Sequence, residues 1–157
     1  MKINLESPDQ EDVVRLIEEL DDYQKPLYPP ESHHGVDIAV LIQPNVIFAV
    51  VRDDNSQAIG CGAVFLTPGY GELKRMYLRP QHRGQGIAGV LLDFLETEAR
   101  ARGCTLFTLE TGVSQPEALA LYAKAGYVRC EPFGDYSPDP FSVFMRKDVC
   151  RTPDSGQ

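Results

Sequence analysis

A strand-like run, a glycine-rich turn and a long amphipathic pattern follow one another without interruption between residues 72 and 102. Residues 72–78, ELKRMYL, have strand character, and Pro80 ends the run. From residue 84 to 102 the apolar residues recur at helical spacing, and Gly103 follows as a C-terminal stop. The apolar stripe consists of Ile87, Val90, Leu91, Phe94 and Leu95. The succession indicates a fold in which helices pack on a sheet.

Hydrophobic patterning supplies the remaining elements. The expected strands are residues 2–6, 46–52, 58–66, 104–111, 127–131 and 141–147, and the other expected helices are residues 8–23, 36–43 and 116–125. Ser7 is expected to be the N-cap of the first helix, with Gln10 completing a capping box. This order predicts the α/β (α+β) class: a central mixed, twisted sheet with helices on both faces.

Length and composition fit a single domain. A chain of 157 residues can bury roughly 70% of its unfolded surface. We expect one domain over residues 1–148, followed by a flexible C-terminal tail over residues 149–157. No apolar run approaches the roughly 20 residues that cross a bilayer, and the N-terminal residues lack the pattern of a signal peptide. The sequence therefore predicts a cytoplasmic protein with no membrane association.

Charge and cysteine spacing argue against two further classes. The net charge of −8 disfavours a nucleic-acid partner, because nucleic-acid binders normally carry a broad basic face. The cysteines are scattered, without a CxxC pair or clustered histidines, at Cys61, Cys104, Cys130 and Cys150. Neither a disulfide framework nor a metal site is expected from this spacing.

Positive charge nevertheless gathers around the glycine turn. The stretch from Leu73 up to Asp93 holds no acid and contains four cations: Lys74, Arg75, Arg79 and Arg83. Unpaired N–H groups and the helix dipole make the start of a helix an anion site, and Gly84 and Gly86 let a phosphate approach the amides. We interpret the stretch as a site for a phosphorylated ligand. The alternative is that RGQG is only a tight turn before a helix.

Two motifs in register resemble the GNAT superfamily of N-acetyltransferases. Residues 83–88, RGQGIA, match its R/Q-x-x-G-x-G/A motif, and residues 72–103 resemble its central strand, pyrophosphate loop and helix. Residues 109–127, LETGVSQPEALALYAKAGY, resemble the strand and helix that follow. The element order also agrees with that superfamily. The resemblance covers roughly residues 1–148 and implies a GNAT domain that uses acetyl-CoA.

On the donor side, the resemblance implies that acetyl-CoA lies in a V-shaped split between two parallel strands. The backbone of Met76, Tyr77 and Leu78 would then pair with the pantetheine arm. The pyrophosphate would be held by the amides of Gly84, Gln85, Gly86, Ile87 and Ala88, with Arg83 beside it. Gln115 stands where family members often have a cofactor-binding asparagine, and the alternative is that it only caps the following helix.

The resemblance also implies two catalytic residues. Tyr122 falls where the family often places a tyrosine near the thioester sulfur, and a phenol can protonate the departing thiolate. The alternative is that Tyr122 only packs against the sheet. Glu72 is the first candidate for the general base, unless it is a solvated strand-end acid, and Glu110 is a weaker candidate. A backbone N–H near Met76 or Tyr77 would stabilise the thioester oxygen, and transfer to the amine would be direct.

On the acceptor side, the family usually lines the pocket with the connection of the first two helices and the loop between the last strands. The candidates here are Tyr28, Glu31, His33, His34 and Tyr136. Residues 1–37 hold ten acids and three bases, so the field would attract a cationic primary amine of a small molecule or peptide. The alternative is an ordinary solvated helix face.

Two other functions remain compatible with the resemblance. One is a non-catalytic acyl-CoA-binding sensor, and the other is a transferase that uses another acyl-CoA donor, such as succinyl- or propionyl-CoA. Many members of the superfamily dimerise, so a homodimer is also open, although no exposed apolar pattern in the sequence argues for one.

Overall fold

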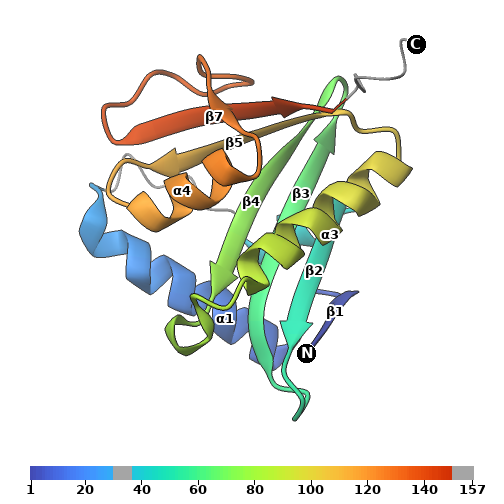
Figure 1. Ribbon diagram of the computed structural model, residues 1–157. Coiled ribbons are helices and arrows are strands. Elements are labelled where there is room, and N and C mark those ends of the chain that lie inside the picture. The colour runs from blue at the N-terminus through green and yellow to red at the C-terminus, as the bar shows by residue number, and fades with distance from the viewer. Residues whose placement is uncertain (30–36, 150–157) are drawn as a thin grey trace.

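The computed structural model describes residues 1–29 and 37–149 and forms one seven-stranded sheet with helices (Figure 1). The sheet order is β1-β2-β3-β4-β5-β7-β6. The strands are β1 (Lys2–Leu5), β2 (Val46–Arg52), β3 (Ala58–Thr67), β4 (Tyr70–Leu78), β5 (Leu106–Gly112), β6 (Val128–Arg129) and β7 (Ser142–Asp148). The helices are α1 (Glu11–Gln24), α2 (Ile38–Leu41), α3 (Ile87–Ala101) and α4 (Pro116–Lys124), with short 3-10 turns η1 (Lys25–Leu27) and η3 (Pro80–His82).

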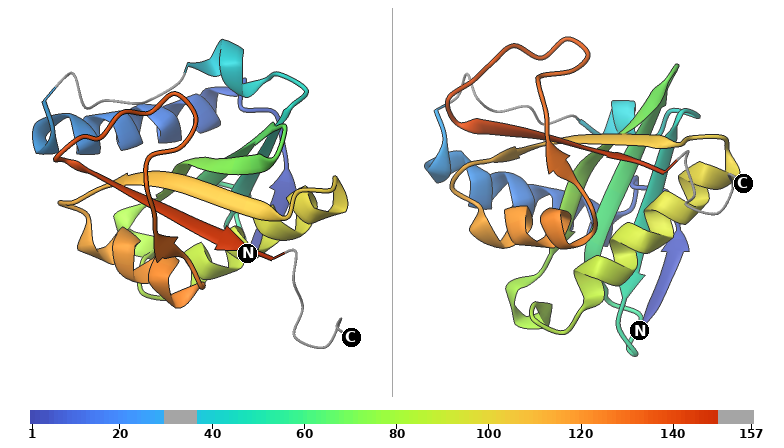
Figure 2. Two further views of the ribbon diagram at one scale, coloured as in Figure 1. Left: turned by 90° about the horizontal axis from the view of Figure 1, so that it is seen from above. Right: turned by 45° about the horizontal axis from the view of Figure 1, so that its top comes forward.

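The sheet is the middle of three layers (Figure 2): α1 and α2 cover one face, and α3 and α4 cover the other. One core packs α3 against the sheet around Leu92, Leu95 and Phe107. The other packs α1 against the opposite face around Leu16 and Phe48. The predicted class, the mixed sheet and the order of elements are confirmed. In the described part of the chain, no helix is long and apolar enough to cross a membrane.

The helix α2 is shorter than the predicted span of residues 36–43, and the predicted starts of α1 and α3 are each three residues too early for a local reason. α1 begins at Glu11 with Gln10 as its N-cap, not after Ser7. Ser7 Oγ instead accepts a bond from the Asp9 N–H, and Gln10 Nε2 donates to the Ser7 carbonyl. These residues form a turn of their own, so the capping box does not form. α3 begins three residues later than predicted, because the glycine turn before it has a left-handed backbone.

The main irregularity of the sheet is the separation of β4 from β5. These neighbouring strands are parallel, but they pair only where Gly71–Leu73 lie opposite Phe107–Leu109. Beyond this point β4 bulges: Arg75 has φ +60°, and the pairing with β3 shifts register around Gly62. From Lys74 onward the β5-facing edge of β4 therefore has no strand partner among the described residues.

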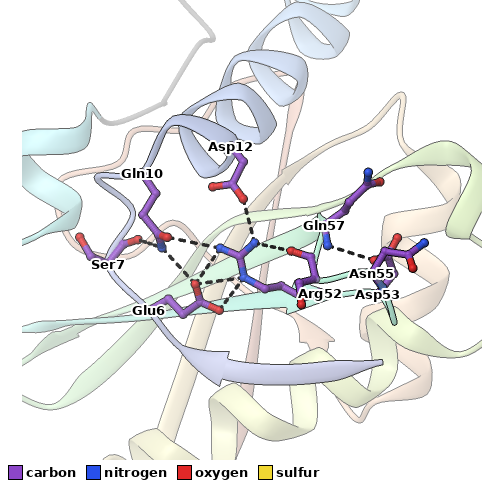
Figure 3. A network of polar contacts seen from close by, with 9 residues as sticks. Glu6, Ser7, Gln10, Asp12, Arg52, Asp53, Asn55 and Gln57 are labelled. Carbon is purple, nitrogen blue, oxygen red and sulfur yellow. Dashed lines mark hydrogen bonds and ion pairs between the residues drawn. The ribbon is translucent and has the colours of Figure 1, made fainter.

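Arg52 on β2 joins the N-terminal elements through a network of polar contacts (Figure 3). Its guanidinium donates to both carboxylate oxygens of Glu6, which follows β1, and to Asp12 on α1 at 2.8 Å. It also donates to Gln10 Oε1 and to the Ser56 carbonyl. The hydrogen bonds from Arg52 lower the pKa of the Glu6 and Asp12 carboxyls. One side chain thus fixes the N-terminal end of α1 against the sheet.

We expect the stability contributed by this cluster to depend on pH. Because the folded-state pKa of Glu6 lies below its ordinary value of 4.5, the contribution is complete above pH 4.5 and is lost as the pH falls through the lowered pKa. An Arg52→Met variant should therefore be less stable than wild type by about 1–2 kcal/mol at pH 7, with a smaller difference near pH 3. Denaturant unfolding at both pH values measures this, with Arg100→Met on the exposed side of α3 as the control. An equal difference at both pH values would contradict the linkage.

Candidate functional site

A cleft of about 490 Å³ opens where β4 leaves β5. Its walls come from β4, the glycine turn, the start of α3, the helix α4 and the last turns of α1. The lining residues are Leu20, Tyr23, Met76, Tyr77, Leu78, Arg83, Gly84, Gly86, Ile87, Ala88, Gly89, Leu91, Gln115, Glu117, Ala118, Ala120, Leu121 and Tyr122. Of the ten residues expected to bind the donor, only Gln85 is absent from this lining.

The glycine turn is shaped by its backbone angles. Gly84 has φ +78° and Gly86 has φ +82°, a region that other residues adopt only at a cost, although a side chain would find open space at either position. Gly86 is the N-cap of α3, so the first N–H groups of that helix have no partner within the helix. These donors and the unpaired edge of β4 border one cleft, which fits an extended amide chain that ends in a phosphate.

The four cations of the turn region have different partners. Arg75 pairs with Asp21 at 2.6 Å and Arg79 with Glu19 at 2.9 Å, so both bind α1. Lys74 lies 3.2 Å from Glu72 Oε2. The positive charge of these three side chains is therefore largely compensated by carboxylates. The interpretation of the four cations as one anion site did not anticipate these partners.

Arg83 is the member of this group that lines the cleft. Its Nε donates to the Leu78 carbonyl at 2.8 Å. Its guanidinium carbon lies 5.7 Å from the ring centroids of both Tyr23 and Tyr77. The arginine is therefore held between two aromatic rings beside the glycine turn.

Tyr122 lies at the inner wall of the cleft. Its side chain is 6% exposed and meets the ring of Tyr127 edge-on, with centroids 5.8 Å apart. Its hydroxyl makes no hydrogen bond to any of the described residues, whereas the Tyr127 hydroxyl donates to Glu96 at 2.7 Å. Burial raises the pKa of Tyr122 above its ordinary value of 10.0, so the phenol keeps its proton at neutral pH.

The structure does not bring Glu72 and Tyr122 into the same cavity. Glu72 lines a second cavity of about 590 Å³, together with Tyr136 and other residues of the connection between β6 and β7. Glu72 Oε2 accepts a hydrogen bond of 2.6 Å from the Tyr136 hydroxyl, which also lies 2.6 Å from Lys74 Nζ. Glu110, the weaker candidate base, accepts from Ser142 Oγ at 2.6 Å. The catalytic roles of both carboxylates stay predictions.

The expected acceptor residues are separated in the structure. Tyr136 packs in an aromatic cluster with Phe133 and Phe144. Tyr28 lies instead at the end of β5, where its hydroxyl donates to Gln115 Oε1 at 3.1 Å. The Gln115 side chain makes no capping hydrogen bond to α4, contrary to the alternative hypothesis that it only caps this helix. Three of the acceptor predictions lie outside the described residues: Glu31, His33 and His34.

Sequence reasoning missed the contributions of α1 and most of α4 to the cleft. Leu20 and Tyr23 are one helical turn apart near the end of α1, and both line the cleft. Their spacing continues the apolar stripe of α1, so the pattern was visible. It did not distinguish a residue of the core from one at the rim of a cavity.

Comparisons with known proteins agree with this geometry. A model of the Acetyltransferase (GNAT) family matches residues 13–127. An IAA acetyltransferase from Azospirillum brasilense is 49% identical over 146 residues, which cover 92% of this chain and 95% of the relative. The uncharacterized N-acetyltransferase YsnE of Bacillus subtilis is 36% identical over 152 residues, 95% of this chain and 100% of the relative.

The fold also resembles those of solved structures. A Klebsiella pneumoniae protein assigned to the acyl-CoA N-acyltransferases is 39% identical, with a TM-score of 0.81 over 94% of this chain and 97% of the other. The PaiA N-acetyltransferase from Thermoplasma acidophilum, in complex with coenzyme A, has a TM-score of 0.70 at 18% identity and covers 94% and 99% of the two chains. The second likeness concerns the fold alone.

The two ends of α3 allow a matched test of the glycine turn. Gly86 and Gly103 both have positive φ, +82° and +88°, and a side chain would meet nothing within 4 Å at either position. Alanine should therefore cost each site a similar amount of stability, roughly 1–2 kcal/mol. Only Gly86→Ala should also weaken coenzyme A binding, by about tenfold or more, because it reorients the amides that face the cleft. Calorimetric titration measures this, and equal affinities in the two variants would argue against an anion site at the turn.

Proposed function

Since the chain belongs to the GNAT family of acetyltransferases, we propose that it transfers the acetyl group of acetyl-CoA directly to a primary amine of a small molecule or peptide. One observation carries the proposal: the left-handed glycine turn, the unpaired edge of β4 and the buried phenol of Tyr122 all border one cleft. The arrangement combines an anion cradle, a backbone edge for an extended chain and a proton donor.

The donor would lie along β4. The backbone groups of Met76, Tyr77 and Leu78 would bind the pantetheine amides in the way that a neighbouring strand does. The amides of residues 84–88 would face the pyrophosphate, with the guanidinium of Arg83 held nearby by the rings of Tyr23 and Tyr77. The apolar lining from α4 excludes water from the arm.

A cationic amine must lose two protons, one before its nitrogen can attack and one as the amide forms, while the departing sulfur gains one; the remaining proton passes to solvent. Acetyl-CoA provides a thioester carbon: the amine nitrogen forms a bond to it while the carbon–sulfur bond breaks. Tyr122 would supply a proton to the departing sulfur, and its raised pKa means that increasing the pH to 10 does not remove that proton. Glu72 would take the proton of the amine through the Tyr136 hydroxyl, which it already contacts.

The acceptor would reach the site from the α1 side of the sheet. The carboxylates of Glu72 and Glu110 face this side, because they alternate along their strands with Leu73 and Leu109 of the α3-side core. Three acids of α1 are paired with arginines, so the remaining acids of that helix supply its negative field. Such a field favours a cationic amine. The relative at 49% identity is named an IAA acetyltransferase, so IAA belongs among the compounds to be tested. We propose the cytoplasm as the setting of the reaction.

A panel of acceptors tests the function. Acetyl-CoA would be incubated with the protein and with polyamines, aminosugars, amino acids, lysine peptides or IAA, and the acetylated product would be detected by mass spectrometry. Turnover of one class identifies the acceptor. Saturable binding of acetyl-CoA without turnover of any member would favour the acyl-CoA sensor, and turnover with succinyl- or propionyl-CoA alone would favour another donor. A failure to bind any acyl-CoA would refute the proposal.

Replacing Tyr122 by phenylalanine separates catalysis from binding. The ring stays in the core, and no hydrogen bond to the described residues is lost, so Tyr122→Phe should fold with a Tm close to that of wild type. Loss of the proton donor should reduce kcat about 100-fold. The Kd for acetyl-CoA should change less than twofold. An unchanged kcat would show that Tyr122 only packs against the sheet.

A further inference from the structure

A directed chain of hydrogen bonds crosses the end of β5. The backbone N–H of Ser114 donates to the Tyr28 oxygen at 3.2 Å, and the Tyr28 hydroxyl donates to Gln115 Oε1 at 3.1 Å. The Gly112 N–H donates to the same Oε1 at 3.3 Å. A backbone N–H can only donate, so the atom that faces Gly112 must be the amide oxygen. The orientation of the Gln115 side chain is thereby determined.

This orientation has a consequence for the donor cleft, which Gln115 lines. With Oε1 held by two donors at the end of β5, the Nε2 group is directed away from them, and it donates to none of the described residues. We propose that Tyr28 is a positioning residue for the donor: it holds the amide of Gln115 so that Nε2 donates to a carbonyl of the bound acyl-CoA. The inference rests on the proposed function.

Gly112 makes the contact possible. A Cβ at this position would overlap the Tyr28 hydroxyl and would lie 2.8 Å from Gln115 Oε1. The φ of Gly112 is not in the left-handed region, so the effect of adding a methyl group here would be steric. Only a residue without a side chain admits the phenol at this point of β5.

Packing and protonation keep Tyr28 in place. Its ring meets that of Phe141, just before β7, edge-on with centroids 6.4 Å apart. Desolvation raises the pKa of Tyr28 above its ordinary value of 10.0, so the hydroxyl remains a donor at neutral pH. The length of the Gln115 side chain also matters: compared with asparagine, its additional methylene lets Oε1 reach back to the Gly112 N–H.

Tyr28 thus has a different role from the one that the sequence suggested. Tyr28 belongs to the connection between α1 and α2, which was expected to bind the acceptor, yet its hydroxyl acts on a residue of the donor cleft. Its loss should therefore affect the affinity for acyl-CoA more than the KM for the acceptor. A merely structural role would lower the Tm without this difference.

A double-mutant cycle tests the inference. Tyr28→Phe, Gln115→Ala and the double variant would be titrated with acetyl-CoA by calorimetry, with Tyr70→Phe, which lies away from the cleft, as the matched control. We expect Tyr28→Phe to raise the Kd about fivefold, and the double variant to bind as Gln115→Ala does, since both act through one amide. Gly112→Ala should reproduce the effect of Tyr28→Phe. Tyr70→Phe should bind as wild type does.

Side-chain NMR of the free protein provides a second readout. In wild type the Nε2 protons of Gln115 should report an ordered amide, and Tyr28→Phe should increase its mobility. An unchanged Kd, multiplicative effects in the cycle, or an unchanged Gln115 amide in Tyr28→Phe would each overturn the positioning role. If wild type binds no acyl-CoA, the proposed function fails, and the inference that the amide serves a ligand fails with it; this outcome is recognised from wild type alone.

Discussion

The structure depends on the early end of the parallel pairing between β4 and β5, which stops after three residue pairs. Arg75 produces this separation, since its positive φ places a bulge in the strand, and Gly62 opposite it leaves space for Met76. Backbone groups in a sheet normally pair with the next strand. The separation leaves one edge of β4 unpaired at the position where α4 and the glycine turn of α3 meet. The cleft is thus a consequence of backbone geometry before any functional side chain is considered.

Two of the cations near the glycine turn stabilise the separated half of β4 by binding α1. This half of β4 has no pairing with β5, and α1 holds it from one face of the sheet through the ion pairs of Arg75 with Asp21 and of Arg79 with Glu19. Tyr77 also donates to Glu19. Several acids of the N-terminal helix therefore have a structural partner. The cation cluster has two roles: Arg75 and Arg79 anchor α1, whereas Arg83 remains at the cleft.

Local patterns in the sequence predicted much of this arrangement. Periodicity gave the order of the elements and part of the apolar face of α3: Ile87, Leu91 and Leu95 are buried as expected, but Val90 is 51% exposed and Leu92 is buried instead. Nine of the ten residues that the motifs identified as donor-binding candidates line one cleft. The bulge at Arg75 had no signal, because the residue is neither glycine nor asparagine. The contact of Tyr28 with Gln115 joins positions 87 residues apart, and one sequence carries no information on such pairs. The failed capping box at Ser7 shows a local motif overridden by the network around Arg52 and Gln10.

The unpaired edge of β4 also links the binding of acyl-CoA to the lifetime of the folded chain. An acyl-CoA molecule lying there would act as a missing strand, joining the two halves of the sheet that otherwise share three residue pairs. Any ligand that binds only the native state stabilises it by mass action, by about 2.7 kcal/mol at a concentration of 100 times its Kd. A cell depleted of the metabolite would then hold a more protease-sensitive protein. The abundance of the enzyme would follow the supply of its own substrate without a separate regulatory domain.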